Sequence, residues 1–283
     1  MLRQALGLLI IVALSGAGYL LLTSDGRQLL DRATINYTRW QNNWYYRDGL
    51  PLPGTPDLVK LDERLKAQGV AVGAPVFLRI FKLESELEIW MEKDGRYQKF
   101  ATYPICLWSG RLGPKLREGD RQSPEGFYAV TKDELNPNSR WHRSFSLGFP
   151  NAFDRALGRT GSFIMVHGGC QSVGCFAMTN DVVDEIWRLV TAALDSGQGA
   201  FNVQVFPFRM TETNLAVRKG DKWSAFWADL KNGYDAFERT HLPPMVSVCD
   251  GRYVFAEARP GAVQPSTAEC AATASREPQP SRD

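Results

Sequence analysis

The chain has 283 residues, of which 44% are hydrophobic and 23% are charged, as in a folded protein with a sizeable core. Its formal net charge is only +2, and it contains no long basic run or RNA-binding motif, so no nucleic-acid partner is expected. The composition leaves folded enzymes and binding domains as the classes to distinguish.

The N-terminus carries an uncharged stretch, 5–22, which follows Arg3 and is 18 residues long. This length is at the lower limit for a helix that spans a bilayer, and it is long for the core of a signal peptide. We expect residues 1–24 to form an uncleaved membrane anchor, with a cleaved signal peptide as the alternative. Both interpretations predict that the rest of the chain is exported.

Residues 25–74 are predicted to hold a linker and short helices. Aromatic residues recur in the first part, where they would form either an interfacial belt just outside a membrane or a short helix packed on the domain. These aromatic residues are Tyr37, Trp40, Trp44, Tyr45 and Tyr46. A Pro-rich linker at 50–56 precedes an amphipathic helix that ends at Gly69.

Beyond this linker, runs of β-branched and aromatic residues predict a series of strands. The main ones are 75–81, 86–91, 123–130, 162–166 and 201–206. A strongly amphipathic helix at 180–197 interrupts the pattern, and a helical region follows at 221–240. The predicted fold class is α+β, mainly β with flanking helices.

These changes in pattern also predict domain boundaries. A β-rich domain at 75–208 is followed by an extension of helix and strand, 209–258, that packs on it. Residues 259–283 are rich in Ala, Pro, Ser and Glu and contain almost no large apolar side chain. We therefore expect the last segment to be a disordered tail.

Five cysteines are an odd set for an exported protein, in which structural thiols tend to pair. Two disulfides are considered, Cys106 with Cys170 and Cys249 with Cys270, although spacing alone does not fix the connectivity. In that arrangement Cys175 is the remaining thiol, either free or held for chemistry.

The segment MVHGGCQSVGCFAMTN (165–180) contains a histidine and two cysteines. In a zinc site, His167, Cys170 and Cys175 would supply three ligands, and tetrahedral structural zinc needs a fourth that no neighbouring residue offers. In a structural loop, the glycines would form turns around a half-buried histidine. That alternative does not explain why a strand ends in VHGG and a helix begins just beyond SVGC. No metal or cofactor is predicted.

A cysteine nucleophile accounts for both features. His167, at the end of an apolar strand, would act as the base for Cys175, whose thiol is otherwise mostly protonated at neutral pH. The backbone amides of Gly174 and Cys175 would form an oxyanion hole, because a glycine allows close approach to a substrate carbonyl. Ser172 and Gly168 would support the loop. This arrangement predicts attack on an amide carbonyl and a thioester acyl-enzyme.

HGGCQSVGCFAM resembles the His-Gly … Ser-x-Gly-Cys signature of the YkuD-type L,D-transpeptidase catalytic domain. Further blocks, in the same order, are similar to the YafK-like branch: RIFKLESELEIWM, YPICLWSGRLGPK, EGDRQSPEGFYAV, LGFPNAFDRALGRTGSF and VQVFPFRMT. The resemblance covers residues 75–255. It implies an L,D-transpeptidase catalytic fold over 75–208, with Cys175 as the nucleophile and His167, oriented by a backbone carbonyl, beside it.

The resemblance also implies a setting for the protein. Its partners would be peptidoglycan stem peptides, its process cell-wall biogenesis and cell shape, and its location the periplasm. The N-terminal segment would connect it to the inner membrane, and no cofactor is implied.

The chain departs from the cross-linking members of this family. Those members read Ser-His-Gly-Cys followed by an arginine that can pair with a substrate carboxylate, whereas Val173 and Ala177 stand at these positions here. The step of eight residues from His167 to Cys175 is also short. The YafK-like branch shares both features, and it often carries an acid where Gly169 stands.

By this resemblance the function is hydrolysis, through a thioester on Cys175, of the amide that links murein to a lipoprotein at meso-diaminopimelate. One alternative is an L,D-transpeptidase that forms cross-links or attaches protein to murein. A second is a non-catalytic peptidoglycan-binding module. Arg111, Lys115 and Arg121 are expected to bind substrate carboxylates, with a solvated, turn-rich loop as the alternative.

Overall fold

A computed structural model describes residues 18–19, 23–258 and 268–270. The predicted anchor or signal peptide at 1–24 lies almost wholly outside these residues, and so does most of the predicted tail at 259–283. Within the described ranges, no helix is long and apolar enough to span a bilayer.

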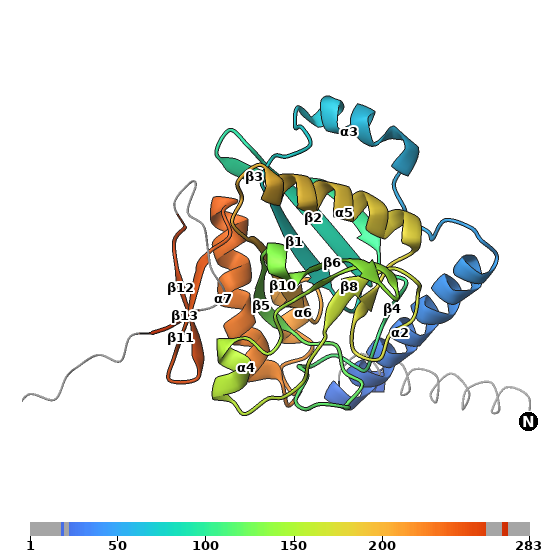
Figure 1. The fold of residues 1–283 in the computed structure, drawn as a ribbon. Helices are drawn as coiled ribbons and strands as arrows, with labels where there is room; N and C mark the ends of the chain where they lie inside the picture. Colours follow the sequence, from blue (N-terminus) through green and yellow to red (C-terminus); the bar gives the residue numbers. More distant parts are fainter. Residues whose placement is uncertain (1–17, 20–22, 259–267, 271–283) are drawn as a thin grey trace, which may run out of the picture.

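A five-stranded sheet in the order β3-β2-β1-β10-β5 forms the centre of the molecule (Figure 1). Its strands are β1 (Val76–Phe81), β2 (Glu86–Lys93), β3 (Arg96–Pro104), β5 (Gly126–Val130) and β10 (Phe201–Phe206). β1 and β10 pair in parallel and the other pairs are antiparallel. β1 is buried along its whole length, because alternate side chains enter cores on opposite faces, Leu78 on one and Phe77 on the other.

A second five-stranded sheet, in the order β4-β9-β8-β7-β6, carries the predicted site. Its strands are β4 (Leu107–Trp108), β6 (Leu135–Ser139), β7 (His142–Ser146), β8 (Met165–His167) and β9 (Phe176–Ala177). β8 begins later than the strand predicted at 162–166, because Phe163 has a φ of +52°, which no extended strand allows.

Helix α5 (Asn180–Asp195) packs its apolar face against both sheets. Thr179 caps its first turn by accepting a hydrogen bond from the backbone N–H of Val182. Val182 and Ile186 share one core with Val166 of β8 and Val203 of β10. This core therefore fixes the sheet of the site to the central sheet.

A second core, rich in aromatic residues, covers the opposite face of the central sheet. Helix α7 (Ser224–Thr240) contributes Trp227, which packs with Phe127 of β5 and Phe206 of β10. The smaller elements around this core are α4 (Ala152–Ala156), α6 (Glu212–Ala216), β11 (Met245–Cys249), β12 (Arg252–Ala256) and β13 (Ala268–Glu269). A disulfide between Cys249 and Cys270 joins the end of β11 to the residue after β13.

The N-terminal part differs from the predicted linker and short helices. Residues 24–47 form one helix of 24 residues, α2 (Ser24–Arg47), which runs along one side of the molecule (Figure 1). It docks through polar groups: Asp31 forms a buried ion pair with Arg218 at 2.7 Å, and Asn42 Nδ2 donates to the Ile105 carbonyl. The remaining short helices are η1 (Leu58–Lys60), α3 (Leu61–Gln68) and η2 (Lys132–Glu134). The predicted α+β class is confirmed.

Candidate active site

Two neighbouring parallel strands carry the predicted histidine and cysteine. β8 ends at His167, and β9 begins directly after Cys175, with Val166 paired to Phe176 and His167 paired to Ala177. Continuing this register by one residue sets Cys175 level with Met165, two positions before His167 on the adjacent strand. Residues that are level or two apart in a parallel pair project from the same face, so the two side chains share one side of the sheet.

His167 is held in one orientation. Its side chain is buried, with 2% of its surface exposed, and Nδ1 lies 2.5 Å from the carbonyl oxygen of Gly168. Because a carbonyl only accepts, Nδ1 carries the proton and Nε2 of the neutral ring is free to accept one. Burial lowers the pKa of the imidazole below its ordinary value, and the hydrogen bond to Gly168 opposes this in part. The ring is therefore neutral at pH 7 and can act as a base.

Cys175 is a free thiol on the site's loop. Sγ donates to the carbonyl of Phe163 and accepts from the N–H of Met165, both at 3.4 Å. Burial raises the pKa of the thiol, while the Met165 N–H and the positive charge of Lys115 act in the opposite direction. The resting site thus has a thiol and a neutral imidazole on one side of the sheet, and the proton must move when the sulfur attacks.

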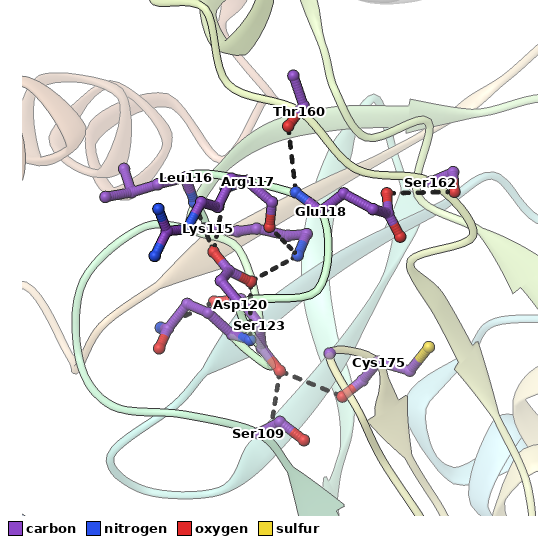
Figure 2. A network of polar contacts seen from close by, with 12 residues as sticks. Ser109, Lys115, Leu116, Arg117, Glu118, Asp120, Ser123, Thr160, Ser162 and Cys175 are labelled. Carbon is purple, nitrogen blue, oxygen red and sulfur yellow. Dashed lines mark hydrogen bonds and ion pairs between the residues drawn. The ribbon is translucent and has the colours of Figure 1, made fainter.

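Two serine hydroxyls, of Ser172 and Ser123, donate to the peptide of Cys175, and Figure 2 shows Ser123 between Cys175 and Ser109. The carbonyl oxygen of Cys175 accepts from Ser172 Oγ at 2.7 Å and from Ser123 Oγ at 3.2 Å. Since the proton of Ser172 is used there, Ser109 Oγ is the donor in its 2.8 Å contact with Ser172 Oγ. Ser109 N–H also donates to Ser123 Oγ at 3.0 Å. These bonds fix the peptide that bears the nucleophile.

The predicted oxyanion hole is only partly available. The N–H of Gly174 already donates to Ser172 Oγ at 3.1 Å, so it has a partner inside the loop. Among the hydrogen bonds of the described residues, none uses the N–H of Cys175, which leaves it as the candidate donor. Gly174 has a φ of +139°, a conformation that favours glycine, and it brings the loop against Ile164.

Gly168 and Gly169 are required by the close approach of Asn180 and of Trp141, respectively. A Cβ on Gly168 would lie 2.6 Å from Asn180 Oδ1 and 3.2 Å from the Trp141 carbonyl. Gly169 has a φ of +87° and lies beside the Trp141 ring, which explains why no acidic side chain stands there. The Trp141 ring itself lies over His167, with centroids 5.8 Å apart.

Lys115, predicted to bind substrate carboxylates, is instead buried and paired with a carboxylate of its own loop. Its side chain is buried, and Nζ donates to Asp120 Oδ1 at 2.6 Å and to the carbonyl of Arg117 (Figure 2). Asp120 also accepts from the N–H groups of Leu116, Arg117 and Gln122. Although burial opposes it, these bonds hold the pKa of Asp120 below its ordinary value. The pair therefore shapes the loop, and Lys115 within it is the charge that acts to lower the pKa of Cys175.

Arg111 and Arg121 remain exposed, on separate cavities. Arg111 lines a cavity of about 530 Å³ between α2 and residues 220–223. Arg121 lines a second cavity, of about 460 Å³, together with Ser172 and Val173 of the site's loop. The structure therefore brings Arg121 to the loop and sets Arg111 apart from it.

Cys170 is bonded to Cys106, which ties the loop of the site to the chain just before β4. A thiolate ligand of a zinc site is therefore not available from Cys170.

Sequence reasoning overlooked Ser109, Ser123 and Trp141. Ser109 and Ser123 lie inside two of the blocks that carry the family resemblance, and this was the signal that could have found them.

The family model of the L,D-transpeptidase catalytic domain, YkuD, matches residues 80–221. The chain belongs to the L,D-transpeptidase catalytic domain family. A relative from Escherichia coli (strain K12), named "Putative L,D-transpeptidase YafK", is 48% identical over 186 residues, which cover 66% of this chain and 76% of the relative. A relative of the same name from Escherichia coli O157:H7 has the same identity and coverage. The predicted family and the predicted enzyme class are confirmed.

Solved structures of two further proteins are similar to this L,D-transpeptidase-family chain. The helical cell shape determining protein Pgp2 from Campylobacter jejuni is 20% identical with a TM-score of 0.39, and the match covers 62% of this chain and 63% of Pgp2, less than two thirds of its length. Bd1075 from Bdellovibrio bacteriovorus is 16% identical with a TM-score of 0.36, over 61% of this chain and 76% of its own.

Within the L,D-transpeptidase family, the missing arginine has a local structural reason in this chain. Ala177, which stands at the position of that arginine, has no exposed surface and lies in β9 beside Leu107 of β4. A guanidinium there would be buried without a partner. Enzymes of this family act on peptidoglycan, which supports the predicted peptidoglycan partner.

Proposed function

We propose that this enzyme hydrolyses an amide bond at meso-diaminopimelate in peptidoglycan stem peptides, and that its substrate is the linkage between murein and a lipoprotein. The observation that carries the proposal is the pair of a free thiol, Cys175, and a neutral histidine, His167, whose Nδ1 is fixed by the Gly168 carbonyl. An amide carbonyl is the substrate group that such a pair attacks.

The steps use groups of this chain only. As Cys175 Sγ bonds to the carbonyl carbon, its proton passes to His167 Nε2, and the oxyanion accepts from the Cys175 N–H. The carbon–nitrogen bond then breaks, and His167 returns the proton to the leaving amine. A water molecule, deprotonated by His167, then attacks the thioester carbon; the carbon–sulfur bond breaks, the carboxylate is released, and His167 returns the proton to Cys175 Sγ.

The residue at position 177 supports water rather than an amine as the acceptor. Cross-linking members of the family carry an arginine where Ala177 is buried here. Without that cation, a second stem peptide has one fewer bidentate partner for its carboxylate. An L,D-transpeptidase that forms cross-links or attaches protein to murein remains the second candidate, distinguished by its products.

Stem peptides carry carboxylates, and two exposed cations offer partners for them. Arg121 borders the cavity beside Ser172 and Val173, and it is the one we assign to the substrate next to the nucleophile. Arg111 borders the larger cavity, whose Asp31 and Asp120 are already paired with Arg218 and Lys115. Because these two carboxylates have other cations as partners, the Arg111 guanidinium is available to pair with a more distant carboxylate of the substrate.

We also propose that the protein works in the periplasm and that residues 5–22 anchor it in the inner membrane. The uncharged stretch and the murein substrate support this location. A signal peptide that is cleaved would give the same compartment, and mass spectrometry of the mature N-terminus distinguishes the two.

The test is to trap the acyl-enzyme. Full-length enzyme is incubated with muropeptides that carry a lipoprotein-derived peptide on meso-diaminopimelate, and its intact mass and tryptic peptides are measured. We expect a thioester adduct on the peptide that contains Cys175, release of the peptide, and loss of both in Cys175→Ala. Ser162→Ala is the matched control, since Ser162 makes only a 3.4 Å contact with Glu118.

Three results would contradict the proposal. Full activity in Cys175→Ala would remove the nucleophile. Binding of muropeptide with no adduct and no product would indicate a non-catalytic module. New cross-links between tetrapeptides, in place of free carboxylate, would indicate a transpeptidase.

A further inference from the structure

Helix α2 has its apolar side on the outside. The residues that face the domain are Asp31, Ile35 and Asn42, which are buried and mostly polar. The opposite face carries an apolar stripe, with successive members three or four positions apart, as on one side of a helix. The outer stripe consists of Leu29, Ala33, Tyr37, Trp40 and Trp44.

The side chains of the outer stripe are exposed. Trp40 has 65% of its surface exposed, Tyr37 59% and Leu29 49%, and the rings of Tyr37 and Trp40 lie 6.0 Å apart. A helix on the surface of a soluble protein normally turns polar residues outward, so this arrangement is the reverse of the usual one. A contiguous apolar patch of this kind marks an interaction site.

From this arrangement we infer that the outer stripe of α2 rests in the interface of a lipid bilayer. Only Thr23 separates α2 from the uncharged stretch 5–22, so an anchor formed by that stretch brings the helix to the membrane surface. Tryptophan and tyrosine are the residues that concentrate at this level of a bilayer. The inference goes beyond the proposed reaction and rests only on the proposed anchor.

The charges beside the outer stripe fit anionic lipid headgroups. Arg32 and Arg47 are exposed on α2, and neither forms an ion pair within the described part of the chain. Such cations are attracted to the negative surface of a phosphatidylglycerol-containing membrane. An amphipathic helix that combines this charge with tryptophan lies flat in the interface.

This placement has a consequence for the catalytic site. Arg39 of α2, which points away from the outer stripe, lines the cavity that also contains Ser172 and Val173. A helix is only about 10 Å across with its side chains, so the cavity next to the nucleophile would open close to the membrane surface. A site that opens close to the membrane favours a substrate that is also held there, such as murein linked to a membrane-proximal protein.

The experiment measures tryptophan emission from the full-length chain in vesicles of phosphatidylethanolamine and phosphatidylglycerol with brominated acyl chains. Two of the eight tryptophans belong to the outer stripe, so we expect quenching of up to about a quarter of the emission. The double variant Trp40→Phe/Trp44→Phe should lose this quenching. Trp90→Phe is the matched control, since Trp90 packs on Phe237 of α7, and the quenched fraction should not fall.

A melting temperature of the double variant equal to that of the unsubstituted protein shows that the fold is intact. Absence of quenching, or quenching that persists in the double variant, would overturn the inference. So would a cross-linked dimer through Tyr37 that depends on concentration, because the stripe would then face a second copy. Co-sedimentation with purified murein sacculi that is lost only in the double variant would assign the stripe to a glycan. None of these outcomes alters the acyl-enzyme test, so the two proposals fail separately.

Discussion

The hydroxyl of Ser172 donates a hydrogen bond of 2.7 Å to the carbonyl oxygen of Cys175, three residues further along the chain. The same oxygen accepts from Ser123, which lies 52 residues away in sequence. Two hydroxyl donors on one carbonyl hold the backbone at the nucleophile, next to the Cys175 amide that is the candidate oxyanion donor. This network is therefore a positioning device rather than part of the reacting groups.

We expect Ser172→Ala to lower kcat roughly tenfold, which corresponds to about 1.4 kcal/mol. A bond of this kind contributes about 1 kcal/mol, and an orphaned partner such as Gly174 N–H adds about 1–3 kcal/mol. Steady-state hydrolysis measures the fall in kcat, and thermal unfolding measures the loss of stability. Ser123→Thr, which keeps the hydroxyl, should retain more activity than Ser123→Ala, and equal losses in both would argue against a role for the hydrogen bond.

The rate of alkylation of Cys175 by iodoacetamide should rise with pH, with a midpoint above the ordinary thiol value of about 8.5. Burial raises the pKa of this thiol, so the protonated form is favoured in the native state and the thiolate is scarce at pH 7. His167→Gln should abolish hydrolysis at pH 7 but leave this midpoint in place, because the imidazole is neutral at rest. A midpoint below 7 would instead indicate a resting thiolate–imidazolium pair.

Lys115→Met should move the same midpoint still higher. The positive charge of Lys115 acts to lower the pKa of Cys175, so its removal disfavours the thiolate. Lys115→Arg is the control that keeps the charge beside Asp120. An unchanged midpoint in a folded Lys115→Met protein, verified by its melting temperature, would show that the charge does not reach the sulfur.

Removal of the Cys106–Cys170 disulfide should cost about 4 kcal/mol in the chain-entropy model, because it closes a separation of 64 residues. It should also lower kcat, since Cys170 lies three residues after His167. The pair Cys249 and Cys270, separated by 21 residues, should cost about 3 kcal/mol and leave kcat unchanged. The Cys106→Ser/Cys170→Ser and Cys249→Ser/Cys270→Ser variants, compared by urea unfolding and hydrolysis, measure both effects.

Ala177→Arg should destabilise the enzyme rather than convert it to a cross-linking one. Ala177 has no exposed surface, and overpacking alone costs about 1–3 kcal/mol before the unpaired charge is added. Val173→Arg is the matched control, because Val173 is 72% exposed and an exposed substitution stays within about 0.5 kcal/mol. A stable Ala177→Arg protein that forms cross-links would show that this position alone selects the acceptor.

The strands and helices with clear periodicity were predictable because the spacing of apolar residues within each segment indicates which face is buried. β1 and β10 follow runs of apolar residues, and α5 follows an amphipathic repeat. The hairpin of β6 and β7 was not found, since its residues are mostly polar and the middle of β6 is exposed. The length of α2 was underestimated because its inward face is mostly polar. The usual sequence pattern identifies a helix by the apolar face that it buries.

The sequence by itself determined the candidate nucleophile and its histidine. His167 ends a strand and Cys175 follows a glycine turn, and both properties depend on a few adjacent residues. Only the tertiary structure decided which groups surround them. It brought Ser109 and Ser123 to the Cys175 peptide, buried Lys115 against Asp120, and gave the Gly174 amide a partner. The contacts of Ser109 with Ser172 and of Ser123 with Cys175 join segments that are distant along the chain, so no local pattern predicts them: they form only when the two sheets pack around one core.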